Sequence, residues 1–185
     1  MFILASASPR RRELLKKIIP EFTIIPSSVD ETIPDNIPAM DVAEFLSTKK
    51  AMDVSKSHPN DIVIASDTII VMNDKVFGKP INENDARNML LLFSNNKHYV
   101  VTGVCVMSKQ RTISFSSINE VEFYNLSEQE IENYLKNDEY KDKAGSYAIQ
   151  GNASLFVKQI KGDYNSIVGL PVSQLYRVLK NFFNF

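Results

Sequence analysis

The sequence has little of what disulfide-linked, zinc-binding or membrane-spanning proteins need. Its one cysteine, Cys105, has no partner in the chain, which excludes an internal disulfide and is typical of a reducing cytoplasm; we expect this thiol to be buried. Only two histidines are present, and the surroundings of His58 and His98 indicate surface residues rather than metal ligands. No apolar run approaches the roughly 20 residues of a membrane span, and no export signal is visible, so we expect a soluble, cytoplasmic protein.

Charge of either sign is not in excess. The 185 residues carry a formal net charge of -1, so the composition offers no general attraction to nucleic acid or to an anionic membrane, and any phosphate binding must be local. The sequence contains neither an internal repeat nor a low-complexity tract, and 44% hydrophobic and 23% charged residues are typical of a globular protein. We therefore expect one domain spanning residues 1–185, with two lobes.

The order of apolar and polar segments predicts a mixed α/β fold. Short strands at residues 2–5 and 22–25 flank a helix that begins after Ser8, which is the β-α-β start of a sheet with helices on its faces. The chain end, Phe182-Phe183-Asn184-Phe185, is apolar enough to dock on the rest of the protein or on a partner. Further elements are strands at residues 62–65, 69–72 with 76–77 as a hairpin, 99–107, 112–124 and 153–160, and helices at residues 40–56, 83–93, 127–136 and from 171 onward.

Three successive arginines occupy the first turn of the first predicted helix. Ser8 suits the N-cap and a proline follows it, so the start of this helix is well defined. The helix dipole disfavours each arginine there by roughly 0.3–1 kcal/mol unless an anion lies nearby, and free backbone N–H groups with the Ser6 hydroxyl would complete a phosphate cradle. Because successive helical residues point about 100° apart, we favour Arg10 and Arg11 over Arg12 as ligands; alternatively all three are surface residues.

Asp67 is the strongest candidate for a catalytic residue. It lies between two apolar runs, where a carboxylate is costly to bury without a metal, a cation or water. We expect it where its strand ends or bends, which is the position at which ligands gather in open α/β sheets. Alternatively, Asp67 forms a turn with the Thr68 hydroxyl.

Lysines outside the arginine motif offer further anion ligands. Lys49 and Lys50 both fall on the apolar face of the second predicted helix, which indicates an anion beneath them; alternatively, each extends its ammonium into water. Lys79 stands between Gly78 and Pro80 after the hairpin, without the longer glycine-rich pattern of a P-loop, so Walker-type ATP binding is not predicted.

Two loops contain the remaining candidate ligands. Asp30 and Glu31 lie in a long polar loop over residues 26–38, and oxygen ligands with so few histidines and cysteines point to Mg²⁺ or Mn²⁺ rather than zinc. Residues 144–151 are small and flexible, with Tyr147 and Gln150 as their only large polar side chains; the Gln150 amide suits the edge of a pyrimidine ring. Alternatively, this segment is an ordinary turn. We expect the similar segment 162–171 to be mainly structural.

The motifs of the chain resemble those of the Maf family of nucleoside triphosphate pyrophosphatases. In chain order they are Leu-Ala-Ser-Ala-Ser-Pro-Arg-Arg-Arg-Glu-Leu-Leu, Ala-Ser-Asp-Thr, Gly-Lys-Pro, Lys-Ala-Gly-Ser-Tyr-Ala-Ile-Gln-Gly and Gly-Asp-Tyr-Asn-Ser-Ile-Val-Gly-Leu-Pro. The resemblance implies an inosine triphosphate pyrophosphatase-like (Maf/Ham1) fold, a mixed twisted sheet with flanking helices in two lobes around a cleft, often as a homodimer. It also implies cleavage of a nucleoside triphosphate to the monophosphate and pyrophosphate with a divalent cation, Mg²⁺ or Mn²⁺.

The same resemblance implies roles for individual residues. Asp67 matches the proton acceptor, Glu31 matches an acidic active-site position, and both are expected to ligate the metal. Thr68 and Gln150 match specificity positions, and the glutamine of the Ala-Ile-Gln-Gly motif resembles the branch that acts on dTTP and UTP. The residues that match phosphate-binding positions are Ser6, Arg10, Arg11, Lys50 and Lys79.

Two other classes of function remain open at this stage. The cleft could bind a nucleotide without cutting it, as in a regulator of cell division or septum formation, although a carboxylate facing a polyanion gains such a sensor little. The basic clusters at residues 10–12 and 49–50 could contact nucleic acid, which the balanced net charge argues against.

Overall fold

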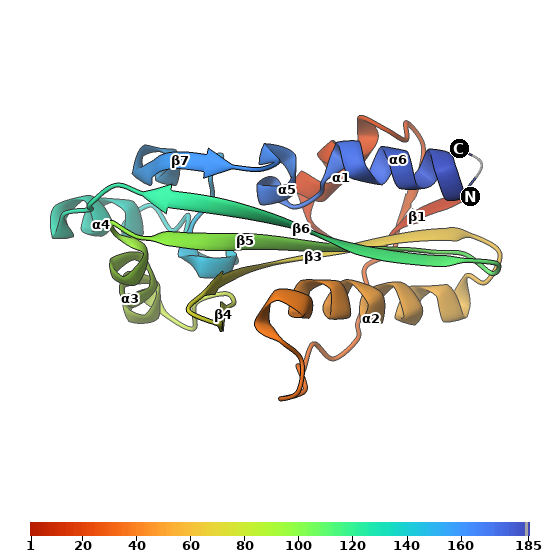
Figure 1. Cartoon of the computed structure of the whole chain (residues 1–185), viewed down its shortest axis with the longest axis horizontal. Helices are drawn as coiled ribbons and strands as arrows, with labels where there is room; N and C mark the ends of the chain where they lie inside the picture. The colour runs from red at the N-terminus through yellow and green to blue at the C-terminus, as the bar shows by residue number, and fades with distance from the viewer. Residues whose placement is uncertain (184) are drawn as a thin grey trace.

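Three long strands run along the longest dimension of the molecule (Figure 1). The computed structural model describes residues 1–183 and 185. The strands are β3 (Ile62–Met72), β5 (Lys97–Met107) and β6 (Thr112–Phe123), and β3 and β5 are rich in β-branched residues, which favour a pleated, buried surface. Each pairs antiparallel with the next over most of its length, so the three strands form a continuous sheet that extends through both ends of the molecule.

Shorter strands extend this sheet on both sides. The order is β2-β1-β3-β5-β6-β7, with β4 paired to β3. Strand β1 is parallel to β2 and to β3, and the other pairs are antiparallel. The bounds of the short strands are β1 (Phe2–Leu4), β2 (Thr23–Ile24), β4 (Lys75–Phe77) and β7 (Val157–Lys161).

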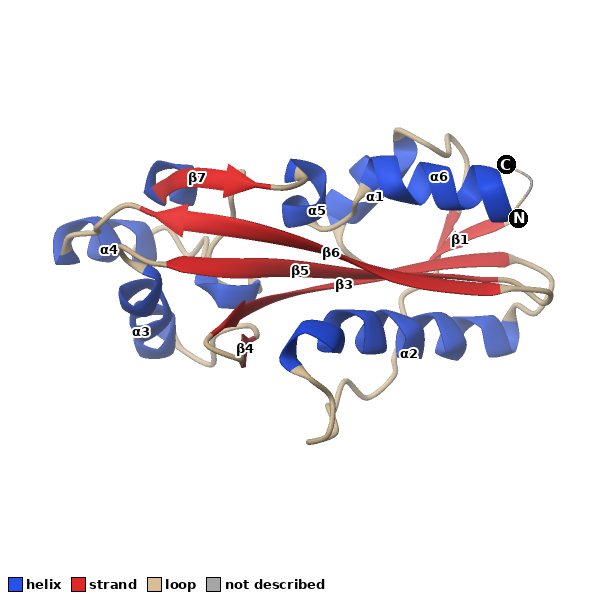
Figure 2. Cartoon of the chain, in the orientation of Figure 1, coloured by secondary structure: helices blue, strands red, loops and turns tan. Residues whose placement is uncertain are grey.

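Helices cover both faces of the sheet (Figure 2). Helix α2 lies along one face, α1 and α6 lie on the opposite face at the same end, and α3 and α4 lie at the other end. In the described part of the chain, none of them is both long and apolar enough to span a bilayer. The bounds are α1 (Pro9–Lys16), α2 (Val42–Ser57), α3 (Glu83–Phe93), α4 (Glu128–Leu135), α5 (Tyr164–Val168) and α6 (Val172–Phe182).

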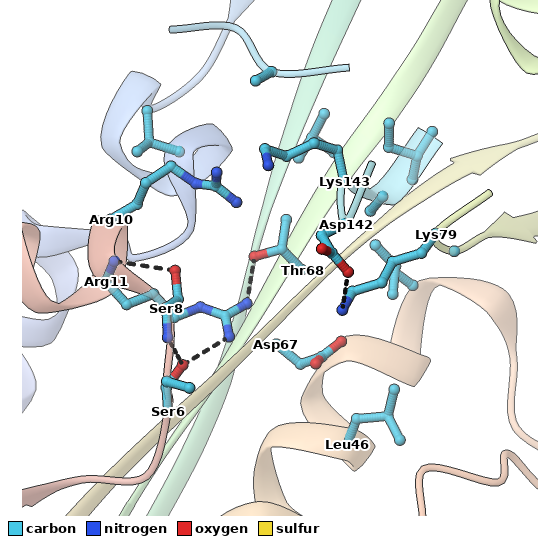
Figure 3. A pocket seen from close by; sticks show the side chains of 18 of the residues that line it. Ser6, Ser8, Arg10, Arg11, Leu46, Asp67, Thr68, Lys79, Asp142 and Lys143 are labelled. Carbon is cyan, nitrogen blue, oxygen red and sulfur yellow. Dashed lines mark hydrogen bonds and ion pairs between the residues drawn. The ribbon is translucent and has the colours of Figure 1, made fainter. Parts of the chain in front are cut away.

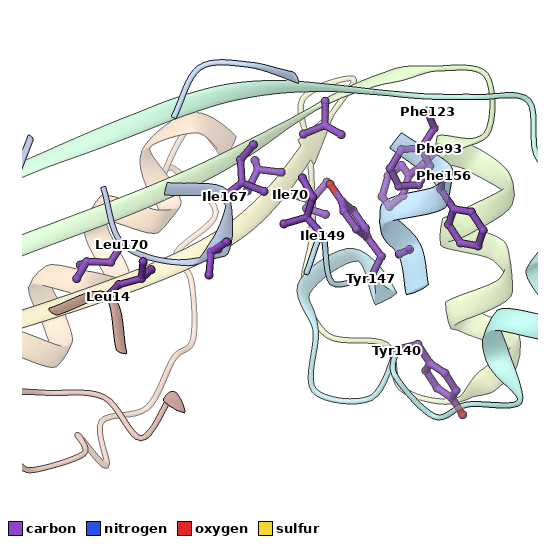
Figure 4. Close-up of a cluster of buried hydrophobic side chains, with 14 of the residues drawn as sticks. Leu14, Ile70, Phe93, Phe123, Tyr140, Tyr147, Ile149, Phe156, Ile167 and Leu170 are labelled. Atoms are coloured by element: carbon purple, nitrogen blue, oxygen red, sulfur yellow. The ribbon is translucent and has the colours of Figure 1, made fainter. Parts of the chain in front are cut away.

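The side chains of β3 alternate between two sides of the sheet. Val63 and Ile69 pack in the clusters beneath α2, whereas Ile64 and Ile70 belong to a larger core that extends over both ends of the molecule (Figure 4). Helix α2 lies so close to β5 that a Cβ at Gly103 would lie 2.2 Å from backbone atoms of α2, so only glycine fits there.

One edge of β3 is open in the middle. Strand β1 pairs with this edge only as far as Ile64, and β4 pairs with it from Ile70 onward, while β5 occupies the opposite edge throughout. The segment between these two residues, which contains Asp67, therefore has no neighbouring strand on one side among the described residues. A sheet that lacks a strand locally leaves room for a ligand between its two ends.

Most predicted elements are confirmed, including the β-α-β start and the capping box of Ser127 and Glu130 that opens α4. The expectation that the strand ends or bends at Asp67 is wrong, because β3 continues to Met72 and Asp67 pairs with Gly103 of β5. The strand predicted at residues 153–160 starts later, since Asn152–Phe156 forms a 3₁₀ helix before β7.

Other predictions concern single residues. Cys105 is fully buried as expected, and burial raises its thiol pKa to about 11. The surface position predicted for His98 is wrong: its side chain is fully buried. In the apolar chain end, Phe185 packs edge-on against Phe2, with ring centroids 5.7 Å apart, while Asn184 lies outside the described residues.

Candidate active site

A cavity of about 790 Å³ opens at the unpaired edge of β3 (Figure 3). It is lined by the turn between β1 and α1, by α2, by the loop after β4 and by residues 142–150, which follow α4. The lining of the cavity therefore comes from both ends of the molecule. Every site residue predicted from the sequence lines it, namely Ser6, Arg10, Arg11, Glu31, Lys50, Asp67, Thr68, Lys79 and Gln150.

The start of α1 holds Arg11 in a fixed position. Ser8 is the N-cap and accepts a hydrogen bond from the Arg11 backbone N–H. The Arg11 guanidinium donates to the Gly169 carbonyl and to the hydroxyls of Ser6 and Thr68, each at 3.2 Å. Figure 3 shows the contacts with the two hydroxyls. Burial lowers the Arg11 pKa, and the nearby Asp67 opposes that shift. Arg11 is thus a preorganised cation that ties α1 to β3 and to the segment after α5.

Arg10 also lines the cavity, whereas Arg12 is exposed and does not. The sequence-based choice between the three arginines is consistent with these positions. The reason is the helical rotation between successive residues, which turns Arg12 away from the side that Arg11 faces.

Asp67 and Lys50 form a largely desolvated ion pair. Their atoms Oδ1 and Nζ are 2.5 Å apart, and the exposed fractions of the two side chains are 11% and 12%. Glu31, from the loop before α2, lies 3.0 Å from the same Nζ with 58% of its side chain exposed. One ammonium therefore bridges two carboxylates, one deep and one at the rim.

The neighbouring lysine has a different environment. Lys49 donates to the Thr32 carbonyl and lies over the Phe45 ring, and it is not part of the cavity lining. The expectation that both lysines face an anion is therefore wrong for Lys49.

Lys79 and Lys143 line the opposite side of the cavity. Lys79 is 66% exposed and pairs with Asp142 at 3.4 Å. Burial, and to a smaller extent the charges of Arg10 and Lys79, lower the Lys143 pKa, so Lys143 lies near cations from both sides of the cavity. A backbone hydrogen bond from the Gly145 N–H to the Gly78 carbonyl joins the two loops. Asp142 and Lys143 are not among the site residues predicted from the sequence, although Lys143 is the first residue of the motif Lys-Ala-Gly-Ser-Tyr-Ala-Ile-Gln-Gly.

The remaining wall of the cavity is mostly apolar. Ile149 belongs to this wall, and Tyr147 lines it with its hydroxyl hydrogen-bonded to the buried His98 at 2.7 Å. Because this hydroxyl is already engaged, Tyr147 contributes shape rather than a free polar group. Gln150 is exposed at the rim. The other apolar residues of this wall include Ile70, Val100, Ile167 and Val168.

The segment 162–171 is more than the structural loop that its sequence predicts. It forms α5, whose residues Ile167 and Val168 line the cavity. The Gly169 carbonyl accepts from both Arg11 and the Ser66 hydroxyl, the latter at 2.9 Å. Gly169 has a φ of 135°, a backbone conformation that favours glycine.

The carboxylates at the site are compatible with a divalent cation that binds together with phosphate. Among the residues that the structure describes, no three or more His, Cys, Asp or Glu side chains are grouped to hold a metal. Asp67 and Glu31 nevertheless provide two carboxylates on one ammonium. Mg²⁺ is typically held by one or two carboxylates, with substrate phosphates as further ligands.

The fold is shared with solved structures of Ham1 proteins. The structure is similar to the Staphylococcus aureus Ham1 protein, with a TM-score of 0.57 and 14% identity over 97% of both chains. It is also similar to a HAM1 protein from Coxiella burnetii, with a TM-score of 0.52 and 13% identity over 97% of this chain and 98% of that one. The predicted fold class is confirmed.

At the level of sequence, the chain is similar to relatives that are named for an enzymatic activity. The chain is 46% identical over 180 residues to the "dTTP/UTP pyrophosphatase" of Bacillus mycoides (strain KBAB4), covering 97% of this chain and 94% of the relative. It is 45% identical over 181 residues to the protein of the same name from Bacillus cytotoxicus, covering 98% and 95%. The family model described as "Maf-like protein" matches residues 1–182. The chain therefore belongs to the Maf family.

Proposed function

We propose that this protein hydrolyses dTTP and UTP to the nucleoside monophosphate and pyrophosphate. The observation that carries the proposal is the composition of the cavity: cations from α1, α2 and two loops face a nearly buried aspartate, beside an apolar wall. Relatives at 45–46% identity are named for this activity.

The cations match the charge of a triphosphate, which is about four negative units and needs several cations before water can attack a phosphorus atom. Arg10, Arg11 and Lys50 would hold phosphate oxygens from one side, and Lys79 and Lys143 from the other. Because Arg11 is already fixed by three hydrogen bonds, little reorganisation is needed when the leaving pyrophosphate develops charge.

Asp67 is suited to act on the attacking water. In the proposed step, the water oxygen forms a bond to the α phosphorus, the bond from that phosphorus to the bridging oxygen breaks, and pyrophosphate leaves with that oxygen. The water proton passes to the Asp67 carboxylate, which is paired with the Lys50 ammonium before the nucleotide binds.

A divalent cation, Mg²⁺ or Mn²⁺, would be held by Asp67 and Glu31 together with phosphate oxygens. When bound, it would neutralise phosphate charge and polarise the phosphoryl oxygens. Both roles are compatible with the carboxylate pair.

The base and sugar are assigned to the apolar wall. Tyr147 and Ile149 provide flat and apolar surface there, and the Gln150 amide at the rim offers donors and an acceptor to a pyrimidine edge. Thr68, which accepts from Arg11, lies between the arginines and the lysines of the cavity (Figure 3).

A panel of purified nucleoside triphosphates, normal and modified, assayed with Mg²⁺ or Mn²⁺ tests this function. The expected result is release of pyrophosphate and monophosphate, fastest from dTTP and UTP. Tight nucleotide binding without pyrophosphate release would instead support the non-catalytic regulator, and release of orthophosphate would indicate another reaction class. The homodimer and the cytoplasmic location stay predictions.

A further inference from the structure

Among the described residues, the Lys50 side chain forms an ion pair with both carboxylates of the candidate metal site. Its Nζ lies 2.5 Å from Asp67 Oδ1 and 3.0 Å from Glu31 Oε1. A cation that ligates both carboxylates has to approach the same oxygens. Two positive charges that share one pair of oxygens at such distances repel each other, and the low exposure of Asp67 and Lys50 weakens the screening by water.

Phosphate oxygens of a bound nucleotide are an alternative partner for the Lys50 ammonium. It lines the same cavity as Arg10 and Arg11, and a flexible lysine stem with three ammonium donors can turn from a carboxylate to a phosphate oxygen. The triphosphate therefore offers Lys50 a replacement for the carboxylates.

We infer that Lys50 competes with the divalent cation for Asp67 and Glu31, and that a bound nucleotide opens this site to the metal by attracting Lys50. This inference rests on the proposed function and adds an order of binding to it. Without a nucleotide, Lys50 keeps the carboxylates neutralised and the metal binds weakly. With a nucleotide, Lys50 contacts phosphate, and the carboxylates become free to ligate.

The competition makes metal and nucleotide mutually supportive by linkage. Each must raise the affinity for the other by the same factor, and typical coupling factors lie in the range of about 5 to 150. Part of any such coupling comes from direct metal–phosphate bonds. The part that belongs to Lys50 is the part that disappears when its charge is removed.

The test is Mn²⁺ binding to the full protein without nucleotide, measured by calorimetry and by the electron paramagnetic resonance signal of free Mn²⁺. Lys50→Met removes the charge and keeps most of the apolar stem. We expect this variant to bind Mn²⁺ at least ~10-fold more tightly than the wild type, within the usual range of coupling factors. Lys49→Met is the matched control, because Lys49 is the next residue on the same helix and touches neither carboxylate; it should bind Mn²⁺ like the wild type.

Lys50→Met leaves the nearly buried Asp67 without its ion-pair partner, which lowers the stability of the fold. A second variant therefore keeps the test valid if Lys50→Met does not fold. Lys50→Gln retains a hydrogen-bond donor for Asp67 and should show the same gain in Mn²⁺ affinity. Mn²⁺ should also raise the unfolding temperature of either variant more than that of the wild type. Unchanged or weaker Mn²⁺ binding in folded Lys50 variants would overturn the inference.

A second measurement isolates the coupling. The affinity for α,β-imido-dUTP is determined with and without Mn²⁺, and the ratio should be smaller in the Lys50 variants than in the wild type and Lys49→Met. An equal ratio in all four proteins contradicts the inference. These results do not depend on turnover, whereas absence of pyrophosphate release by the wild type would count against the proposed function alone.

Discussion

The two cationic walls of the cavity are built in different ways. We call Ser6, Arg10 and Arg11 the arginine wall, and Lys79, Asp142 and Lys143 the lysine wall. Arg11 is fixed by three hydrogen bonds to three separate segments, whereas Lys79 is 66% exposed and held by one pair at 3.4 Å with an 83% exposed partner. An exposed ion pair is worth at most about 1 kcal/mol. Arg11 in the arginine wall is thus held in place before a ligand arrives, whereas Lys79 in the lysine wall is free to adjust.

Asp67 lies beside Lys50 rather than in either wall, so its loss should have the largest effect. Asp67→Asn removes the proton acceptor, and turnover of dTTP or UTP should fall at least ~100-fold, the lower range for a general base. Asp142→Asn, an aspartate of the lysine wall, is the control and should retain most of the turnover. Near-normal pyrophosphate release by Asp67→Asn rejects the role of this residue.

Arg11→Lys tests the rigidity of the arginine wall. Lysine keeps the charge but cannot make three hydrogen bonds in the fork geometry of a guanidinium. With about 1.5–3 kcal/mol for hydrogen bonds to a charged group, kcat/KM should fall roughly 10- to 150-fold, and the unfolding temperature should fall as well. Arg12→Lys, exposed and outside the cavity, should change neither quantity. If both variants behave alike, the wall is not preorganised by these contacts.

His98 supports the apolar wall through Tyr147 and should make stability sensitive to acid. Burial lowers the His98 pKa from 6.5 to about 3, so between these pH values the unfolded chain binds a proton that the folded chain does not. This contribution is present above pH 6.5 and is lost as the pH falls toward 3, at about 1.4 kcal/mol per pH unit. Denaturant unfolding from pH 7 to pH 4 should show a smaller slope for His98→Gln. An unchanged slope means that this histidine titrates normally in the folded protein.

Lys79→Met should have the smallest effect, because the lysine wall is exposed. We expect KM for the nucleotide to rise about 2- to 5-fold, as for an exposed charge pair, with an unchanged unfolding temperature. The rise should shrink at high salt, since exposed charges are screened. A large loss of stability in Lys79→Met would show that the two walls are not built differently after all.

Local signals explain most of what the sequence predicts correctly. The N-cap Ser8 and the capping box of Ser127 and Glu130 involve residues three apart, so they are visible before the chain folds. The cavity residues were found because their motifs are short and their charges unusual for their positions, as with Arg10 and Arg11 at a helix start.

Several features that the sequence does not reveal involve partners that are far apart in the sequence. Asp67 breaks an apolar run locally, but β5 pairs with β3 on both sides of it and keeps the strand continuous. The buried His98 is hydrogen-bonded to Tyr147, 49 residues away, and Arg11 is held by the Gly169 carbonyl, 158 residues away. Lys143 begins a recognisable motif, but the sequence does not show that its loop is bonded to the Gly78 carbonyl through the Gly145 N–H.

The most direct test of the proposed chemistry is hydrolysis of UTP in ¹⁸O-labelled water, with the products analysed by mass spectrometry. Attack on the α phosphorus beside Asp67 should place one ¹⁸O in the monophosphate and none in the pyrophosphate. Label in the pyrophosphate, or in released orthophosphate, would contradict the arrangement in which the cations of the cavity hold pyrophosphate as the leaving group.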